Sequence, residues 1–593
     1  MKKIKRLSAL LLCLALLLAT TACGTTSDVR PDASKDAGEA AKTTAASGES
    51  TPAEPEGENG SSDTINIMIP AEPVTLNALE SQSNLDEYVF YLTSAMLYRS
   101  IDNELVPELC DAMEVSEDGT TYTYTLKEAK YSDGTAVTAA DFVYYMVKRY
   151  LTSENCSQFV GGADTYNGGL DTCEGIYAED DKTFVVRLAE PITTFDGRLE
   201  IYPVNQAYAE GKGESYGGTP ADLQYSGPYI LDDWTVGTSL TLRKNPDYIS
   251  AAELFPLEHV NLYYSGDASS LYSRYASGDV DVVVSINDTV VEAFGEENCY
   301  RFSSGNIYGI EFNSTGFTYT DGDGFVSRGE EVTALMQNEN FRKALCFALD
   351  REAICAAVSP SAEPTNRYVN SDIKGTGDTS YVEEFALSEV APLSGDADAA
   401  KAYLAKALEE LGYGDVSELP AIRFLTFENL QQKTMAETFV SQWKEILGLE
   451  NIEINLQPIQ SAIMSMVYMD YDLYLQQLTL NPDDMVELLS YWETAGSVSD
   501  AAGFQAGGAP AMMASIHADA EYDALVEGIY RNFDDASRLA DMAKAEQMLY
   551  SSYVYFPIMA GGGYGISKDY VHDFVNPYVE GGYGLAHTTL DAH

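Results

Sequence analysis

The chain has 593 residues, of which 45% are hydrophobic and 21% are charged, so it can bury a large core and build more than one lobe. Its 92 acidic residues outnumber 35 Lys and Arg, and the formal net charge is −57 at pH 7. Nucleic-acid binding needs clustered basic side chains, so this balance argues against a nucleic-acid partner. Acidity of this kind is typical of a soluble, exported protein.

The N-terminus has the pattern of a bacterial export signal. A basic start precedes the apolar run 7–18, which is shorter than the roughly 20 residues that a membrane span needs. Residues 20–24 resemble a bacterial lipobox, although a Thr stands where Leu is commonest. We therefore expect residues 1–22 to be a lipoprotein signal peptide and Cys23 to be lipidated. Ordinary signal cleavage is the alternative.

Residues 23–62 follow as a polar, low-complexity segment. After the initial Cys it consists mainly of Thr, Ser, Ala, Glu, Gly and Pro, with hardly a large aliphatic side chain. Such a composition cannot bury enough apolar surface to offset the entropy lost on ordering, so it predicts a disordered tether. A domain anchored through this tether would stay near the membrane and be free to turn.

The folded sequence begins near Asp63, and its patterns alternate between strand and helix. This alternation predicts an α/β architecture. In chain order, the predicted elements are a strand at 64–69, a helix at 85–98, strands at 121–126, 185–188, 229–231, 240–243 and 260–264, a helix at 269–276, a strand at 282–285, helices at 341–358, 397–411 and 430–447, a strand at 452–459, a short apolar run at 472–480, and a helix at 536–550.

The segment 104–149 has the most detailed local pattern. Residues 121–126 alternate Thr with Tyr and predict a strand, and an Asp-Gly pair soon afterwards marks a tight turn. Thr138 then has the position of a helix N-cap, three residues before Asp141, and the next residues supply an apolar face. A turn that leads into a capped helix is common, so this pattern alone assigns no function.

The residues of that segment nevertheless resemble a known family. Val-Pro-Glu-Leu, Ser-Glu-Asp-Gly-Thr-Thr-Tyr-Thr and Tyr-Ser-Asp-Gly-Thr-Ala-Val-Thr-Ala-Ala-Asp-Phe-Val are similar to the signature of solute-binding proteins of peptide-type ABC transporters, the oligopeptide/dipeptide/nickel-binding family. Together with the further matches they cover most of residues 65–559, which makes the resemblance specific. The further stretches that resemble the family, in its order, lie at 226–249, 274–284, 338–354, 401–413 and 545–559.

The resemblance implies a two-lobed α/β fold of the periplasmic-binding-protein type (type II, with an extra domain) and a ligand cleft between the lobes. Domain I is then expected at 63–99, 225–304 and 561–593, domain II at 100–224, and domain III at 305–560. Ligand capture would occur by closure of the lobes about the strands that connect them.

In this family the ligand is bound largely through backbone hydrogen bonds to extended segments of the cleft. By position, two segments of this chain match, and two Tyr residues are further candidates for which packing is the alternative. The candidate ligand contacts are Ser83, Asn84, Leu85, Tyr229, Tyr308, Gln477, Leu478, Thr479, Asn481 and Asp483.

The second of these segments departs from the pattern of oligopeptide binders. Where they carry a Trp and, three positions later, an Asp that holds the α-ammonium group of the ligand, this chain has Leu478 and Asn481. Recognition of an ordinary peptide amine is therefore in question. Either Asp483 takes over the charge role, or the segment is a turn that caps a helix beginning near Met485.

Cysteine and enzyme signatures add little. Cys156 and Cys173 enclose a Gly-rich segment and are the pair expected to form a disulfide, whereas Cys346 and Cys355 lie on an apolar helix and are expected as buried thiols. A G-x-S-x-G sequence at 213–217 has no buried strand before it, and the five His residues have no metal-binding spacing. We expect no enzyme activity, no metal and no cofactor.

The sequence thus predicts an extracellular solute-binding lipoprotein of an ABC importer, monomeric and anchored by its lipid at the extracellular face of the bacterial cytoplasmic membrane. The expected solute is a peptide or a peptide-like compound, delivered to a permease that works with cytoplasmic ATPase subunits. The alternative keeps the fold and changes the ligand or the role, to a binder of a nickel-chelate or glycan or to a sensory receptor.

Overall fold

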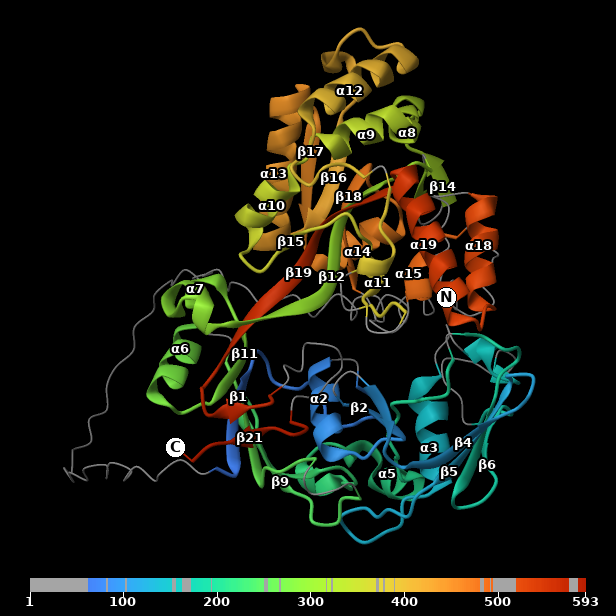
Figure 1. The fold of residues 1–593 in the computed structure, drawn as a ribbon, viewed down its shortest axis with the longest axis vertical. Coiled ribbons are helices and arrows are strands. Elements are labelled where there is room, and N and C mark those ends of the chain that lie inside the picture. Colours follow the sequence, from blue (N-terminus) through green and yellow to red (C-terminus); the bar gives the residue numbers. More distant parts are fainter. Residues whose placement is uncertain are drawn as a thin grey trace, which may run out of the picture.

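The computed structural model describes residues 62–592, apart from gaps at 82–83, 102–103, 152–155, 163–171, 194, 250–253, 266–267, 316, 321–323, 370–372, 377–378, 389, 480–484, 491, 494–518 and 575–584. The predicted signal peptide, Cys23 and nearly all of the predicted tether lie outside these described residues. The chain forms two lobes, drawn one above the other in Figure 1. Each helix within the described ranges is too short or too polar to span a bilayer.

A mixed sheet of eleven strands runs through both lobes. Its neighbour order is β17-β16-β18-β12-β19-β11-β1-β10-β9-β8, and β15 pairs with β19 beside this path. The strands are β1 (Thr64–Ile69), β8 (Tyr229–Thr235), β9 (Ser239–Lys244), β10 (His259–Tyr264), β11 (Val282–Ile286), β12 (Tyr300–Phe312), β15 (Glu363–Pro364), β16 (Ile422–Phe427), β17 (Ile452–Gln457), β18 (Leu473–Thr479) and β19 (Tyr555–Ser567).

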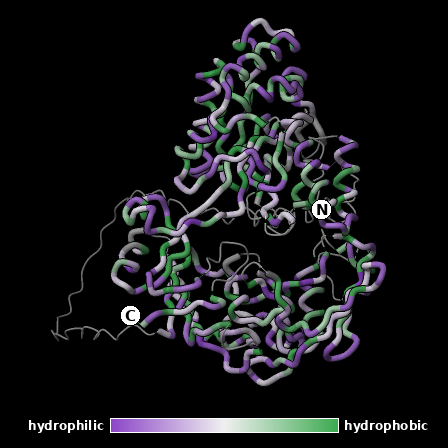
Figure 2. The backbone as a smooth tube through the Cα atoms, in the orientation of Figure 1, coloured by the Kyte–Doolittle hydropathy of each residue, from purple (hydrophilic) through white to green (hydrophobic). Residues whose placement is uncertain are grey.

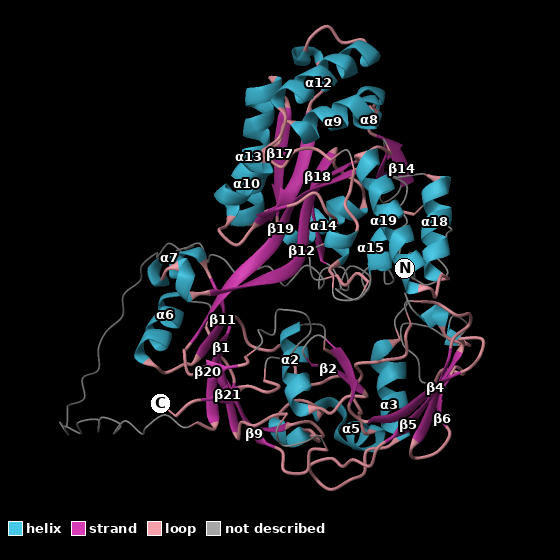
Figure 3. Cartoon of the chain, viewed as in Figure 1, coloured by secondary structure: helices cyan, strands magenta, loops and turns pink. Residues whose placement is uncertain are grey.

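The strands β12 and β19 connect the two lobes (Figure 3). Each has 13 residues, and they pair antiparallel from Tyr300 opposite Gly565 to Glu311 opposite Tyr555. Their register shifts between Ser303 and Ile307. Within this interval Gly305 has φ of 68°, a left-handed conformation that glycine adopts without steric cost. The irregular backbone therefore lies within the strands that cross between the lobes. The backbone must bend there if the interlobe angle changes.

The lower lobe has two parts. One packs helices against the lower strands of the long sheet, and the other is built on a separate four-stranded sheet of order β4-β5-β7-β6. The remaining elements of this lobe are α2 (Asn84–Thr93), β2 (Tyr98–Ile101), β3 (Glu104–Pro107), β4 (Cys110–Val115), β5 (Thr121–Leu126), α3 (Ala139–Tyr145), η2 (Met146–Tyr150), η3 (Cys156–Gln158), β6 (Ile176–Ala178), β7 (Thr183–Arg187), α5 (Gln206–Lys212), η4 (Gly213–Ser215), η5 (Pro220–Asp222), α6 (Ala268–Ser277), α7 (Asp288–Phe294), η6 (Glu296–Asn298), β20 (Val571–His572) and β21 (Thr589–Leu590).

The local pattern predicted near 121–149 is confirmed. The predicted strand is β5, with Tyr and Leu side chains buried on one face. Thr138 is the N-cap of α3 and forms a capping box with Asp141, whose carboxylate accepts the Thr138 N–H at 2.8 Å. Phe142 of α3 stacks on Phe184 at 5.7 Å between ring centroids, so the helix packs directly on the sheet. This segment is scaffold.

The upper lobe surrounds its strands with helices (Figure 1). A two-stranded hairpin, β13 (Phe317–Thr320) with β14 (Gly324–Ser327), follows β12. The helices are α8 (Glu330–Gln337), α9 (Glu339–Phe347), α10 (Arg351–Val358), α11 (Tyr381–Glu384), α12 (Ala397–Leu411), η7 (Val416–Glu418), α13 (Leu430–Leu447), α14 (Ile459–Val467), α15 (Met485–Ser490), α18 (Ala520–Tyr530) and α19 (Asp535–Ser552).

The prediction of a single helix at 341–358 was wrong, because the structure has two helices there, α9 and α10. Asp350 ends the continuity: it is the N-cap of α10, and its carboxylate accepts the Ala353 N–H at 2.9 Å. The apolar periodicity continues across the break because both helices face the same core. Cys346 of α9 and Cys355 of α10 are 1% and 3% exposed, so both are buried thiols as expected.

Each lobe has its own hydrophobic core. The upper core forms around the strands β12, β16, β18 and β19 and includes the fully buried Trp443. The lower lobe has separate cores beneath the four-stranded sheet and along β1 and β10. Figure 2 shows the corresponding hydrophobic stretches at the centre of the upper lobe and along the lower strands. Separate cores allow the lobes to behave as two stiff bodies.

Candidate ligand-binding site

Four of the ten predicted contacts lie together, where β12 and β18 pair near the crossing between the lobes. The register places Tyr308 opposite Gln477 and Leu478 opposite Ile307, and Thr479 pairs with Asn306. These positions are at the end of β18, directly before the segment 480–484. Tyr308 and the 477–479 segment therefore lie side by side in the sheet, while their contact with ligand stays a prediction.

Polar side chains surround this group. Gln477 donates from Nε2 to Oδ1 of Asn306 at 3.0 Å, across the two strands. The Tyr308 hydroxyl donates to Oε1 of Gln431 at 3.4 Å. Burial raises the pKa of Tyr308 well above its usual value, so it stays a neutral donor at physiological pH. The arrangement offers amide and hydroxyl groups, which can hydrogen-bond a peptide backbone in either direction.

Asn306 and Gln431 were missed by the sequence analysis. Asn306 lies in the irregular stretch of β12, and Gln431 lies in the first turn of α13. The position of Gln431 beside Tyr308 depends on the parallel pairing of β16 with β18, which sets where α13 begins. No local pattern in the sequence carries that information. Asn306 had a weak signal, since it follows Gly305 at a predicted domain boundary.

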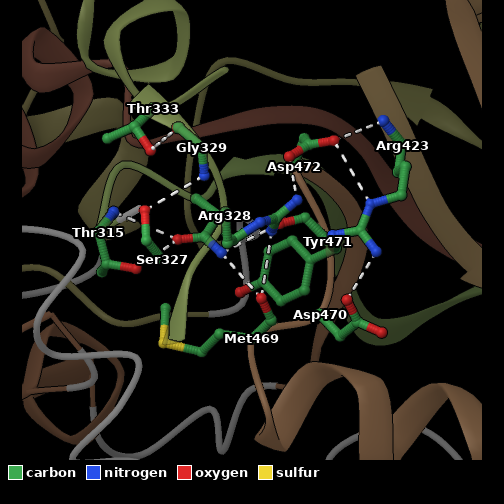
Figure 4. Close-up of polar contacts among 11 residues, drawn as sticks. Thr315, Ser327, Arg328, Gly329, Thr333, Arg423, Met469, Asp470, Tyr471 and Asp472 are labelled. Atoms are coloured by element: carbon green, nitrogen blue, oxygen red, sulfur yellow. Dashed lines mark hydrogen bonds and ion pairs between the residues drawn. The ribbon is translucent and has the colours of Figure 1, made fainter. Parts of the chain in front are cut away.

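The end of β18 opposite the candidate site is fixed by a network of charges (Figure 4). Arg328 donates to the Asp472 carboxylate and, at 3.2 Å, to the carbonyl oxygen of Met469. Asp472 also accepts the backbone N–H of Arg423 at 2.6 Å, and Arg423 pairs with Asp470 at 2.6 Å. The side chains of Arg328 and Asp472 are each 4% exposed. A strand held this firmly presents its far end with little freedom.

The predicted contact segment at 83–85 lies in the lower lobe, at the start of α2. Asn84 and Leu85 are the first residues of this helix. The preceding loop is fixed by Asp86, whose Oδ1 accepts the N–H of Val74 at 2.6 Å and of Thr75 at 3.2 Å. Ser81 donates to the same carboxylate at 3.3 Å. The loop is therefore held both by the buried carboxylate of Asp86 and by its own turn around Asn77, whose carbonyl oxygen accepts the N–H groups of Glu80 and Ser81.

Glu87 is a second carboxylate beside this segment that the sequence analysis missed. It accepts hydrogen bonds from the hydroxyls of Tyr202 and, at 3.2 Å, Ser81, and Arg149 lies 3.9 Å away. Burial raises the pKa of Glu87, although these hydrogen bonds and Arg149 oppose the shift. Because Tyr202 and Arg149 belong to the part with the four-stranded sheet, Glu87 ties the two parts of the lower lobe together.

Tyr229 lies away from the other candidate ligand contacts. It lies on β8 in the lower-lobe core, is 0% exposed, and packs edge to face against Phe255 at 6.1 Å. Packing, the alternative interpretation, describes its environment in this structure. The predicted disulfide is not formed either: Cys156 and Cys173 are buried thiols. The Cys173 thiol instead lies 3.5 Å from the carbonyl oxygen of Val160.

Several predicted residues fall outside the described part of the chain. These are Cys23, Ser83, Asn481 and Asp483. The helix expected near Met485 is present as α15, which begins at that residue. Among the described residues, no group of three or more His, Cys, Asp or Glu is placed to hold a metal ion. A surface cavity of about 530 Å³ is lined by Glu296, Glu352, Cys355 and Ser359, and it includes none of the predicted contacts.

A match to a known protein family covers about two thirds of the chain. The family described as bacterial extracellular solute-binding proteins, family 5 Middle, matches residues 104–500. The chain therefore belongs to this family of extracellular solute-binding proteins, which serve peptide-type ABC transporters and are not enzymes. The two-lobed type II periplasmic-binding-protein fold predicted from the resemblance is confirmed.

Particular relatives are similar over most of their length. Oligopeptide-binding protein AliB of Streptococcus pneumoniae is 25% identical over 558 residues, which cover 85% of this chain and 85% of that protein. The probable deoxycholate-binding periplasmic protein YgiS of Escherichia coli is 26% identical over 402 residues, covering 64% of this chain and 69% of that protein. The structure of Listeria monocytogenes OppA bound to peptide shares the fold, with a TM-score of 0.62, 21% identity, and coverage of 90% and 99% of the two chains.

Proposed function

We propose that the protein captures peptides or peptide-like solutes between its lobes and delivers them to an ABC permease. The observation that carries the proposal is the pairing of β12 and β18, which presents Asn306, Tyr308 and Gln477 beside the crossing between the lobes. A ligand bound there would touch the upper lobe next to the connecting strands. Contacts from both lobes would then stabilise a closed arrangement.

Anchoring and docking extend the proposal. Lipidation of Cys23 and the tether 23–62 would hold the protein at the outer face of the membrane, within reach of the permease. The closed lobes would present a surface that the permease distinguishes from the open form. Cytoplasmic ATPase subunits would supply the energy of transport. The protein would act as a monomer, since one chain provides both lobes of the cleft.

Retention of peptides by the full-length lipidated protein tests the proposal. The protein in detergent is mixed with a pool of three- to eight-residue peptides, passed through a gel-filtration column and analysed by mass spectrometry. We expect peptides to be retained. Asp483→Asn should weaken binding of free-amine peptides about tenfold or more, because a charge-assisted hydrogen bond is lost, and should spare N-acetylated peptides. Asp484→Asn is the matched comparison, because Asp484 is the other acid of this segment, and a loss confined to that variant would assign the charge role to Asp484. A chain that retains no peptide would refute the proposal.

A second candidate is capture of a non-peptide solute. The specific observation is Leu478, which stands where oligopeptide binders carry a Trp and is 5% exposed at the edge of the upper core. A relative named as a probable deoxycholate-binding protein fits this interpretation. Retention of an apolar compound, a nickel-chelate or a glycan from a bacterial extract, with no peptide retained, would favour this candidate and identify its ligand. Signalling without transport would indicate a sensory receptor.

A further inference from the structure

The two lobes meet again far from their connecting strands. In Figure 1 the lower end of α18 reaches the part of the lower lobe that holds β4–β7, on the side opposite β12 and β19. There the segment around Thr193, which follows β7, contacts the C-terminus of α18. The molecule is thus joined at both ends of the space between its lobes, by covalent strands at one end and by a contact at the other.

The contact is a helix cap supplied from the other lobe. The backbone N–H of Thr193 donates to the carbonyl oxygen of Tyr530 at 3.0 Å. The Thr193 hydroxyl lies 3.1 Å from the same oxygen and 3.4 Å from the carbonyl oxygen of Ile529. Both carbonyls belong to the last turn of α18, and that of Ile529 also accepts the Asn532 N–H at 3.2 Å. The lower lobe therefore completes the hydrogen bonding of an upper-lobe helix.

Each side of the contact is fixed in its own core. Ile192, next to Thr193, is 4% exposed in the core beneath the four-stranded sheet. Ile529 and Tyr530 are 0% and 1% exposed in the upper core. A hydrogen bond between two such anchored segments cannot follow a change of interlobe angle by local bending. It either keeps the angle seen here or breaks.

An ion pair flanks these hydrogen bonds. Arg531 lies 3.7 Å from Glu190, and both side chains are about half exposed, at 52% and 49%. Arg531 also lies 3.8 Å from Glu527, one turn earlier in α18. Exposed pairs of this kind contribute little strength but favour the right pairing of two surfaces. The pair therefore orients the contact, while Thr193 supplies most of its strength.

We propose that this contact, formed by Glu190, Thr193 and residues 529–531 and called here the rim latch, sets the interlobe angle of the unliganded protein. The proposal rests on lobe closure in the proposed function. When the latch opens, water can hydrogen-bond the freed carbonyls, so each hydrogen bond favours the latched state by only about fivefold. A latch of this strength restrains the lobes and still opens readily.

The latch is also connected to the candidate ligand segment. The hydroxyl of Tyr522, in α18, donates to the carbonyl oxygen of Leu489, in α15, at 2.7 Å. The helix α15 begins at Met485, directly after residues 480–484, which hold the predicted contacts Asn481 and Asp483. The helix α15 therefore packs against α18, the helix whose last turn forms the latch.

Hydrogen exchange at residue 193 tests the latch directly, because its amide is the donor. The full-length unliganded protein is compared with Thr193→Val, which keeps the branched shape and the N–H, and with Thr193→Val/Glu190→Lys. We expect the residue-193 amide to exchange about fivefold faster in the first variant and about tenfold faster in the second. Small-angle scattering should show a larger radius of gyration for the double variant.

A matched control and a binding measurement complete the test. Asp232→Lys reverses an equally exposed pair, Arg243–Asp232 at 2.8 Å, within the lower lobe, and should leave residue-193 exchange unchanged. Wild-type exchange and an unchanged radius of gyration in the double variant would overturn the latch. If wild type retains no peptide but the variants still exchange faster, the proposed function fails and the latch stands. If wild type retains peptides but the variants exchange the residue-193 amide as slowly as wild type, the proposed function stands and the latch fails.

Discussion

The two lobes are joined at opposite ends by connections of different chemistry. At one end, β12 and β19 cross together as a ladder of backbone hydrogen bonds, 13 residues long on each strand. At the other end, the rim latch consists of Thr193, the last carbonyls of α18 and a half-exposed ion pair. Two continuous, paired strands fix where the lobes can turn, and the few hydrogen bonds of the latch fix how far they have turned.

The same comparison explains the distribution of glycine and aromatic residues. β19 carries Gly561, Gly562, Gly563 and Gly565, where it passes over the lower end of β12. A Cβ at Gly563 would lie 2.4 Å from the ring of Phe302, so the Phe302 ring occupies the space that a side chain at position 563 would need. The crossing is therefore closely packed although four positions of β19 there carry no side chain. The latch has no such packing and relies on polar groups.

The largest expected effect concerns the upper anchor of the crossing, Glu311 on β12. Its carboxyl is 0% exposed, accepts a hydrogen bond from the Tyr471 hydroxyl, and has an Oε2 without a hydrogen-bond partner among the described residues. Burial raises its pKa to about 7. A folded-state pKa above the unfolded value gives stability that is fully present below about pH 4.5 and lost as the pH rises through about 7.

Glu311→Gln removes this dependence. Relative to the variant, wild type should lose about 3 kcal/mol of unfolding free energy between pH 4.5 and pH 7. Urea unfolding of both proteins across this range measures the difference. Tyr471→Phe is the matched second variant: because the hydroxyl lowers the pKa of Glu311, its loss should move the window to higher pH. A difference between wild type and Glu311→Gln that stays flat with pH would contradict the assignment.

The crossing also shows what the sequence could and could not predict. β5 and the capping box of Thr138 with Asp141 followed from local pattern, because both depend on residues within a few positions of each other. The break between α9 and α10 was missed, since the apolar period continued through Asp350. There the N-cap preference of a single Asp overrides a pattern that averages over four turns.

The residues of the candidate site also divide into those that the sequence could predict and those that it could not. The 477–479 segment was identified through the resemblance to a family, which carries tertiary information, whereas Tyr308 was a candidate because of its residue type and its place near the crossover strands. Asn306 and Gln431 depend on which strands pair, and that depends on contacts more than 100 residues apart in the chain. Tyr229 and Tyr308 are both buried, at 0% and 2% exposed, but Tyr229 lies in the lower core, away from the 477–479 segment. Residue type alone could not separate the two.

The next largest effect concerns the backbone of the crossing itself. A Cβ at Gly562 would lie 2.6 Å from the carbonyl oxygen of Ser361 and 3.0 Å from that of Phe302. Both neighbours are backbone atoms and cannot rotate away. Gly562→Ala should therefore destabilise the protein by about 1–3 kcal/mol, the usual cost of overpacking, measured by urea unfolding.

A glycine with free space provides the control. Gly211 lies inside α5, and a Cβ there would meet nothing within 4 Å. Gly211→Ala should stabilise the protein by about 0.5–1 kcal/mol, because alanine loses less backbone entropy in a helix. If both substitutions had the same sign, steric contact at the crossing would not be the cause.

The smallest expected effect concerns salt, and it separates the two parts of the latch. Raising the salt concentration from about 0.1 M to about 1 M shortens the screening length from about 10 Å to about 3 Å and weakens the half-exposed pair of Arg531 with Glu190. Such a pair contributes at most about 0.5 kcal/mol, so exchange of the Thr193 amide should rise about twofold. Amides of β12 should not respond. A rise of tenfold or more would mean that charge, rather than the capping hydrogen bonds of Thr193, holds the rim of the lobes together.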